Sequence, residues 1–382
     1  MWDNSNEPPI LGESAGYVVS ELVRSVCPVE DMSPPVVSIV IINFNYGRFL
    51  ETAIDSALNQ TYAPLEVVVV DDGSTDNSSC ILKKFEGLIT VISKERGGHV
   101  SAFNAGFAAC QGEVVVFLDS DDVLRPNCIA RVMAHWRRGL SKLQYRLDTI
   151  DAEGVDQRMP FPDYPATLTS EEIKRRLLRF GWYPWPVSSG NAFARDFVAK
   201  VTPICEQRIF KSPDGFLNKM APLFGTVGVL DEVLGDYRVH GANVWAQSGK
   251  AMNREAFSRT VRFDAILHAE FVAAAARFGF MVDDYDHQPV PQWVERRQLS
   301  LRLCPERHPI ADDTMLAVLR RGLHSAAVAP GLSVFGRLSW ALWFILIAVL
   351  PEWSLLYFLQ RGRAQSHRTN WARSLVSMSK RA

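Results

Sequence analysis

The stretch Val114–Asp122, Val-Val-Val-Phe-Leu-Asp-Ser-Asp-Asp, decides how the rest of the chain is interpreted. Its five leading apolar residues are too few for a helix and rich in β-branched side chains, which predicts a strand buried on both faces of a sheet. Three carboxylates follow within four residues. Because open α/β sheets bind ligands at the carboxyl ends of their strands, we expect a ligand site at Asp119–Asp122.

The spacing of the acids favours a metal site. Asp119 and Asp121 are two positions apart, so on an extended backbone both side chains point to the same side. Crowded carboxylates are costly without a cation, and hard oxygen ligands suit Mg²⁺ or Mn²⁺ bridging to a phosphate. Asp122 could instead cap a helix that follows Pro126. A cap uses only one of the three carboxylates, so it does not explain the cluster.

Composition narrows the class of protein. The 382 residues are 47% hydrophobic and 22% charged, as in one large α/β domain with additions or in two domains. The net charge of −1 gives no sign of nucleic-acid binding. The six cysteines lack CxxC spacing and no signal peptide is visible, which predicts reduced thiols in a cytoplasmic protein. Residues 1–35 are interpreted as a mobile, acidic tail.

Strands and helices alternate along residues 36–140. We expect strands at Val36–Ile42, Leu65–Val70, Leu88–Ser93 and from Val114, with helices at about Arg48–Gln60, around Ile81–Phe85, at Ser101–Cys110 and after Pro126. Short connections between alternating elements predict parallel strands with right-handed crossovers, as in a nucleotide-binding half-domain. His99, beside Gly97-Gly98, could face a bound diphosphate, but a surface loop is the favoured interpretation.

The pattern changes beyond Gly139. We expect a strand or hairpin at Leu143–Ile150, a helix at Ser170–Arg179, a turn that opens a helix at Lys211–Gly215, a strand at Thr226–Leu230 and helices from Ala251 onward.

Four motifs in order make Val36–Trp136 resemble an inverting glycosyltransferase of family 2 with the GT-A fold. They are the opening strand with its Asn turn (Val37–Asn45), Val-Asp-Asp-Gly-Ser-Thr-Asp (Val70–Asp76), the Gly…Asn-Ala-Gly helix (Gly98–Gly106) and Leu-Asp-Ser-Asp-Asp (Leu118–Asp122). The resemblance continues more loosely to His240.

The resemblance implies an α/β fold with a Rossmann-like, mostly parallel central sheet and helices on both faces, spanning residues 36–245. Residues 36–140 would form the nucleotide-binding half and residues 141–245 the acceptor half. A helical extension (246–330) and an apolar, membrane-associated segment with a basic tail (331–382) would follow.

The resemblance also implies roles for single residues. Donor binding is expected from Asn43, Asn45, Asp72, Asn104, Asp119 and Ser120. Acceptor binding is expected from Ser189, Gly190 and Asn191. Mg²⁺ or Mn²⁺ would be held by Asp119, Asp121 and His240, with Asp121 the direct ligand, although His240 could also be an ordinary loop histidine. Asp214 falls where the family places its catalytic base, but Pro213 replaces the Glu that usually precedes it, and Ser-Pro-Asp-Gly could be only a turn and helix start.

The implied activity is transfer of one sugar from a nucleotide sugar, expected to be a UDP-sugar, to a saccharide or lipid-linked saccharide in surface polysaccharide or glycoconjugate assembly. Repeated transfer is not expected, because the Gln-x-x-Arg-Trp motif of processive synthases is absent. A phosphatase of the haloacid dehalogenase type is disfavoured because Gly73 stands where its second Asp is needed. A non-catalytic nucleotide-sugar or glycan-binding protein on a decayed GT-A fold remains the alternative.

The C-terminal region has two apolar segments, Leu338–Leu350 and Trp353–Leu359, separated by Pro351-Glu352. Three arrangements are open: helices lying in a membrane interface, one spanning helix, or a buried core or oligomer contact. Interfacial helices are favoured, because the segments carry Trp and Tyr and because residues 361–382 contain six Arg or Lys and no acid. This predicts a peripheral enzyme at the inner face of the membrane.

Overall fold

The computed structural model describes residues 33–165, 168–209, 212–240, 254–282, 290–329 and 332–366, with residues 360–366 described by their backbone alone. The expected mobile tail at residues 1–35 lies almost entirely outside these ranges. Most of the basic C-terminal segment, residues 367–382, lies outside them as well.

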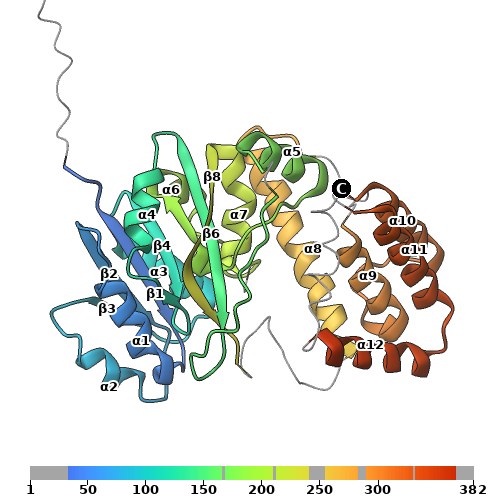
Figure 1. Ribbon diagram of the computed structural model, residues 1–382, viewed down its shortest axis with the longest axis horizontal. Coiled ribbons are helices and arrows are strands. Elements are labelled where there is room, and N and C mark those ends of the chain that lie inside the picture. Colours follow the sequence, from blue (N-terminus) through green and yellow to red (C-terminus); the bar gives the residue numbers. More distant parts are fainter. Residues whose placement is uncertain are drawn as a thin grey trace, which may run out of the picture. The chain divides into compact units, whose positions relative to one another are not determined.

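One eight-stranded sheet organises the described residues, in the order β3-β2-β1-β4-β7-β6-β8-β5 (Figure 1). The strands are β1 (Val37–Asn43), β2 (Leu65–Asp71), β3 (Thr90–Ser93), β4 (Val114–Asp119), β5 (Val123–Leu124), β6 (Leu140–Ile150), β7 (Asn191–Ala194) and β8 (Thr226–Arg238). Strands β1, β2, β3 and β4 pair in parallel, which confirms the expectation from the alternating pattern.

The second half of the sheet is mixed, and the sequence analysis predicted neither β7 nor the two-residue strand β5. Strand β7 lies antiparallel between β4 and β6, whereas β6 and β8 are parallel to each other. With only four residues, β7 is too short to show an alternating pattern. The predicted mostly parallel α/β sheet is confirmed, with this antiparallel strand at its centre.

Successive side chains of each strand point to opposite faces of the sheet, and both faces are apolar here. Helices therefore cover both faces. On one face, Ile39 and Val69 pack with residues of α1 (Gly47–Leu58), α2 (Ser78–Lys83) and α4 (Cys128–His135). On the other face, Val40 and Phe117 pack with residues of α3 (His99–Ala109), α5 (Ser170–Phe180), α6 (Arg195–Val201) and α7 (Pro213–Phe224). The predicted helices on both faces are therefore confirmed.

The C-terminal region is helical, as expected. Its helices are α8 (Arg254–Arg277), α9 (Pro291–Leu303), α10 (Met315–Val328), α11 (Val334–Val349) and α12 (Glu352–Ser366). Phe263 and Phe271 of α8 join the core on the α7 side, whereas Phe257 packs with α9, α11 and α12. Within the described ranges, no helix combines the length and the apolar character needed to cross a membrane.

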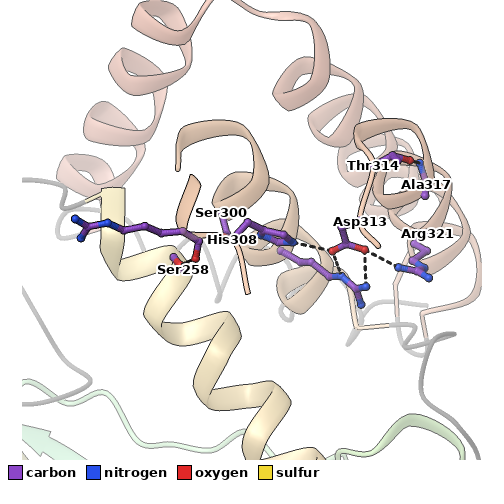
Figure 2. Close-up of polar contacts among 9 residues, drawn as sticks. Ser258, Ser300, His308, Asp313, Thr314, Ala317 and Arg321 are labelled. Carbon is purple, nitrogen blue, oxygen red and sulfur yellow. Dashed lines mark hydrogen bonds and ion pairs between the residues drawn. The ribbon is translucent and has the colours of Figure 1, made fainter. Parts of the chain in front are cut away.

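A buried carboxylate, Asp313, connects helices of this region (Figure 2). Arg297 of α9 donates to it through Nη2 at 2.6 Å, and Arg321 of α10 through Nη1 at 3.0 Å. The Nε2 atom of His308 lies 2.9 Å from Asp313 Oδ2, and its Nδ1 atom lies 2.9 Å from Ser300 Oγ. Burial opposes ionisation of Asp313, but the hydrogen bonds from Arg297 and His308 outweigh it and lower the carboxyl pKa.

Candidate active site

The parallel strands bring three polar residues to one edge of the sheet. In the β1–β2 register Asn43 stands opposite Asp71, and in the β1–β4 register Ile42 stands opposite Asp119. All three strands therefore end within one residue of each other. This is the carboxyl edge, where the sequence predicted a ligand site.

Asn43 fixes the loop after β2. Its buried side-chain amide donates to Asp71 Oδ1 at 2.8 Å, to Ser74 Oγ at 3.2 Å and to Ser78 Oγ at 3.0 Å. Asn45, in the left-handed conformation at φ 57°, accepts the backbone N–H of Thr75 at 2.8 Å. Both Asn residues thus hold the two loops together at the predicted donor site, and their contact with the donor base stays a prediction.

Asp72 is the next polar group along this edge and is almost completely buried. It accepts three hydrogen bonds, from Lys94 Nζ at 2.8 Å, Gly97 N at 2.9 Å and Gly98 N at 2.7 Å. A carboxylate accepts about four hydrogen bonds, so Asp72 keeps capacity for the N–H of a donor base. Lys94 was not singled out from the sequence, because a single Lys after a strand carries no motif.

The acidic motif forms a turn and not an extended strand. Strand β4 ends at Asp119, and the N–H of Asp122 donates to the Asp119 carbonyl at 3.0 Å. The expectation that Asp119 and Asp121 share one side of an extended backbone is therefore wrong, although the turn still brings their charges together. The alternative of Asp122 as a helix cap is also wrong, because α4 begins at Cys128 behind Asn127.

Asp122 instead joins three segments of chain. It is fully buried and accepts Ser189 Oγ at 2.5 Å and the backbone N–H of Arg238 at 2.9 Å. Ser189 Oγ also accepts the N–H of Asp119 at 3.1 Å. The end of β4, the turn before β7 and the end of β8 are thereby fixed relative to one another.

The predicted acceptor-binding residues lie in this buried turn, the short 3₁₀ helix η1 (Ser188–Gly190) and the start of β7. Asn191 donates to the Val187 carbonyl at 2.7 Å, and a Cβ on Gly190 would meet Pro186 at 2.5 Å. Ser189, Gly190 and Asn191 are all buried. Their visible role is to support the acidic turn, and an acceptor contact remains a prediction. Ser120 is also buried, and its donor contact is a prediction in the same sense.

His240, two residues after the end of β8, contacts Asp121. Its Nε2 atom lies 2.9 Å from Asp121 Oδ2. The imidazole is held between aromatic rings, with centroids 5.3 Å from Tyr46 and 5.0 Å from Phe49. Arg238 Nε donates to the Asp121 carbonyl at 2.8 Å and further fixes this corner. Two of the three predicted metal ligands are therefore in direct contact.

His99 belongs to the site, which corrects the expectation of a surface loop. It is the first residue of α3, and its Nε2 atom lies 3.8 Å from Asp119 Oδ1. Burial lowers the imidazole pKa, and the charges of Asp214, Asp72 and Asp121 oppose that shift. The same helix carries Asn104, which contacts the backbone N–H and carbonyl of Ile204 at 2.9 Å each. Asn104 thus fixes α3 against the chain after α6, and its donor contact stays a prediction.

The acids raise each other's pKa values. Burial raises the pKa of Asp119 well above its usual value, and the charges of Asp121 and Asp214 raise it further. Burial likewise raises the pKa of Asp122, with added repulsion from Asp121 and Asp119. Tyr46, buried beside the same acids, has its pKa raised to about 12. Burial and repulsion together therefore make the charged form of Asp119 and Asp122 costly at this edge.

Asp214 lies in the first turn of α7, behind Pro213. Its Oδ1 atom accepts Ser212 Oγ at 2.6 Å. The predicted helix start is confirmed, and Asp214 also lies near enough to the site for its charge to act on His99, Asp119 and Lys142. Proline is well tolerated at a helix start, so Pro213 does not displace this carboxylate.

A buried lysine supports the helix that carries Asp214. Lys142 of β6 is fully buried, and its Nζ contacts Gln144 Oε1 at 2.8 Å, Tyr183 Oη at 3.3 Å and Asn218 Oδ1. Burial lowers the Lys142 pKa well below its usual value, against the attraction of Asp214. Asn218 lies one helical turn after Asp214, on the same side of α7. A single Lys in an apolar strand gave no signal in the sequence.

The residues fit a divalent cation that is shared with a substrate. Among the residues that the structure describes, no three His, Cys, Asp or Glu side chains converge as a metal-binding group. Mg²⁺, however, is usually held by one or two carboxylates together with substrate phosphates and water. The contact of Asp121 with His240 and the mutual repulsion of the acids suit such a partial site.

The chain is similar to known glycosyltransferases, as its sequence motifs predict. Residues 38–194 match the model of the family described as glycosyl transferase family 2. An uncharacterized glycosyltransferase of Nostoc sp. is 35% identical over 226 residues, which cover 57% of this chain and 69% of that protein. The hyaluronan synthase of Pasteurella multocida is 38% identical over 126 residues, 31% of this chain and 13% of the synthase. The chondroitin synthase of Escherichia coli is 30% identical over 209 residues, 49% of this chain and 30% of that synthase.

Solved structures give a weaker likeness. The structure of S. aureus TarS in complex with UDP has a TM-score of 0.46 at 20% identity and covers 80% of this chain and 88% of that one. A mannosyltransferase from Pyrobaculum calidifontis in complex with GDP-Man and Mn²⁺ has a TM-score of 0.48 at 16% identity, with 89% of each chain covered.

Proposed function

The chain belongs to glycosyl transferase family 2, and we propose that this glycosyltransferase moves one sugar from a UDP-sugar to a saccharide or lipid-linked saccharide, with inversion at the anomeric carbon and with Mg²⁺ or Mn²⁺. The observation that carries the proposal is the contact of Asp121 with His240 at the strand edge, together with the action of the Asp121 and Asp214 charges on Asp119. A binding protein without catalysis would not need a separate carboxylate on α7 whose charge acts on that edge.

The donor would lie along the edge from β2 to β4. Asn43 and Asn45 shape the loop for the base, and Asp72 offers its remaining acceptor position to a uracil N–H. Asn104 would stabilise the donor side through α3. The diphosphate would then lie at Asp119 and Ser120, next to the backbone at the start of α3. Nothing in this arrangement selects a particular sugar.

The metal would be held by Asp121 and His240, with Asp119 close by. A divalent cation neutralises the charge that develops on a departing diphosphate. The raised pKa values of Asp119 and Asp122 support this assignment, because burial and the neighbouring acids both make their charged forms costly, and a bound cation would offset that cost.

Asp214 would act as the general base. In the transfer step the acceptor oxygen forms a bond to the anomeric carbon, and the bond from that carbon to the diphosphate oxygen breaks with its electron pair. The acceptor hydroxyl proton passes to Asp214. Direct displacement of this kind inverts the anomeric configuration, as in one-step glycoside hydrolysis. Ser212 Oγ orients the carboxylate, and the Lys142–Asn218 contact supports its helix.

The acceptor is proposed to be a saccharide, because two similar proteins are named as hyaluronan and chondroitin synthases. Since the matched segments are small parts of those synthases, their products do not transfer to this chain. We place the reaction at the inner face of the membrane, in surface polysaccharide or glycoconjugate assembly, where a lipid-linked acceptor would be presented. Ser189, Gly190 and Asn191 are proposed to border the acceptor through their backbone.

A panel of nucleotide sugars tests the proposal. The purified full chain is incubated with each nucleotide sugar and Mn²⁺, and the released nucleoside diphosphate is measured with and without saccharide acceptors. We expect turnover with at least one UDP-sugar, and loss of turnover in Asp214→Asn. The matched control is Asp196→Asn, an exposed first-turn Asp of α6. Nucleotide-sugar binding without any turnover would favour the binding-protein alternative.

A further inference from the structure

Helix α11 has one face that no part of the described chain covers. Six large apolar side chains on it are exposed, from 41% for Ile345 to 75% for Val334. With each residue advancing by about 100°, the six fall within an arc of about 100°. They are Val334, Phe335, Leu338, Leu342, Ile345 and Val349. We call this set the α11 face.

The opposite side of α11 is well packed, so the exposure is not a sign of a loosely placed helix. Trp340 and Phe344 are buried among residues of α9 and α10, and Ile347 among residues of α9 and α12. Trp343 donates through Nε1 to Glu295 at 2.6 Å, and Ser333 caps the helix by accepting the N–H of Gly336 at 3.1 Å. The helix is therefore held at both its start and its inner side.

Helix α12, which follows α11 almost directly, also exposes large apolar side chains. Only Leu350 and Pro351 separate the two helices, so Val349 and Trp353 are four residues apart. Trp353 is 75% exposed, and Tyr357 and Phe358 farther along α12 are exposed as well. Aromatic residues of this kind are favoured at the headgroup level of a bilayer.

The sequence that contains α11 is basic, which favours an anionic partner. Helix α11 contains one ionisable residue, Arg337, and residues 315–382 contain nine Arg or Lys against one acid, Glu352. That acid is paired with Arg254, so it adds little repulsion toward a negative surface. An apolar helix face within a basic segment is the pattern of a helix that lies in a membrane interface.

We propose that the α11 face, extended by Trp353, docks the enzyme on an anionic lipid bilayer, with α11 lying in the plane of the headgroups. The inference rests on the proposed function in one respect only: docking would give the enzyme access to a lipid-linked acceptor. A second copy of the chain is the competing occupant. The excess of basic residues in the sequence of residues 315–382 argues against it, because two such segments would repel each other.

Vesicle co-sedimentation tests the docking surface. The full chain is mixed with phosphatidylcholine vesicles that contain or lack about one third phosphatidylglycerol, at low and at high salt. The test variant is Leu338→Glu with Leu342→Glu. The control is Leu88→Glu, because Leu88 is 64% exposed, the same as Leu338, but lies far from α11 in the sequence, just before β3. Unfolding temperatures confirm that the variants are folded.

We expect binding to the anionic vesicles that weakens at high salt, a loss of at least about tenfold in partitioning for the α11 double variant and no loss for Leu88→Glu. Equal partitioning of the double variant and the native chain would overturn the proposal. So would a native dimer in vesicle-free solution that the double variant dissociates, since a second copy would then cover the α11 face. Release of nucleotide from a UDP-sugar without vesicles is measured in parallel. Its absence would count against the proposed function and leave the docking result standing.

Discussion

Two buried carboxylate clusters in this chain have opposite electrostatics. In the C-terminal helices, Asp313 is surrounded by Arg297, Arg321 and His308, and its pKa is lowered. At the sheet edge, Asp119 and Asp122 lie beside further acids, and their pKa values are raised. Both clusters join separate segments of chain, and in the first the carboxylate is paired with two guanidinium groups and an imidazole.

The difference separates a structural site from a functional one. A buried carboxylate is tolerated when its charge is matched, and Asp313 is matched by two guanidinium groups. At the sheet edge, repulsion from neighbouring acids adds to the effect of burial, and we propose that a bound cation offsets it. This distinction gives a physical reason for assigning catalysis to the sheet edge and architecture to Asp313, although both contain Asp, His and Arg.

The largest expected effect is on turnover at the sheet edge. Asp214→Asn keeps the size of the side chain but removes the base, so kcat should fall by a factor on the order of 10² or more. Affinity for the donor should stay nearly unchanged, because the base acts on the chemical step. Steady-state kinetics on the preferred UDP-sugar measure both quantities. Near-normal turnover in Asp214→Asn would leave Asp214 as a helix-start residue only.

The second effect is on stability in the helical region. Asp313→Ala leaves Arg297 and Arg321 without their shared carboxylate, and we expect unfolding to become easier by about 3 kcal/mol. Thermal or urea unfolding of the full chain measures this loss. Asp312→Ala, at the preceding residue, is the control. If Asp313→Ala unfolds like the native chain, Asp313 does not stabilise the helical region, and the structural role assigned to its cluster is wrong.

The pH dependence of that loss sharpens the comparison. Because the folded pKa of Asp313 is lowered, its stabilisation is present above the ordinary carboxyl pKa and is lost as pH falls through the lowered folded value. The difference in unfolding temperature between native and Asp313→Asn chains should therefore be larger at pH 7 than at pH 3. A difference that grows on acidification would contradict the lowered pKa.

The smallest effect concerns the support of the acidic turn. Ser189→Ala removes the hydroxyl that accepts from Asp119 N and donates to Asp122. We expect the free energy of unfolding to fall by about 1 kcal/mol. We also expect turnover to respond less to added Mn²⁺, with KM changing more than kcat. Ser79→Ala, on an exposed position of α2, is the control. A selective fall in kcat with normal stability would instead favour direct acceptor contact by Ser189.

Much of the fold follows from the sequence because its signals are local. The β-branched runs at Val37–Asn43 and Val114–Asp119 and the helix pattern of Gly47–Leu58 each lie within one element. Strand β7 was not predicted, because its pairing with β4 and β6 is set by tertiary contacts and not by its four residues.

The candidate site also contains residues that could be predicted from the sequence and residues that could not. The acids of the Leu118–Asp122 motif could be singled out from their position after a buried strand. The basic residues of the site could not, because the contacts of Lys94 with Asp72, of Lys142 with Asn218 and of Arg238 with Asp121 join strands and loops that are far apart in the sequence. The place of His99 was predicted wrongly for a related reason, since a Gly-Gly pair predicts a loop without showing that a helix starts there over Asp119.

Calorimetric titration of the full chain with UDP, with and without Mn²⁺, tests the central claim most directly. The native chain and Asp55→Asn, an exposed Asp of α1, should bind UDP much more tightly when Mn²⁺ is present. Asp121→Asn should fold normally and lose this Mn²⁺ dependence, because it removes the carboxylate that contacts His240. Equal UDP affinity with Mn²⁺ and with chelator in the native chain would contradict a cation-completed donor site at the sheet edge.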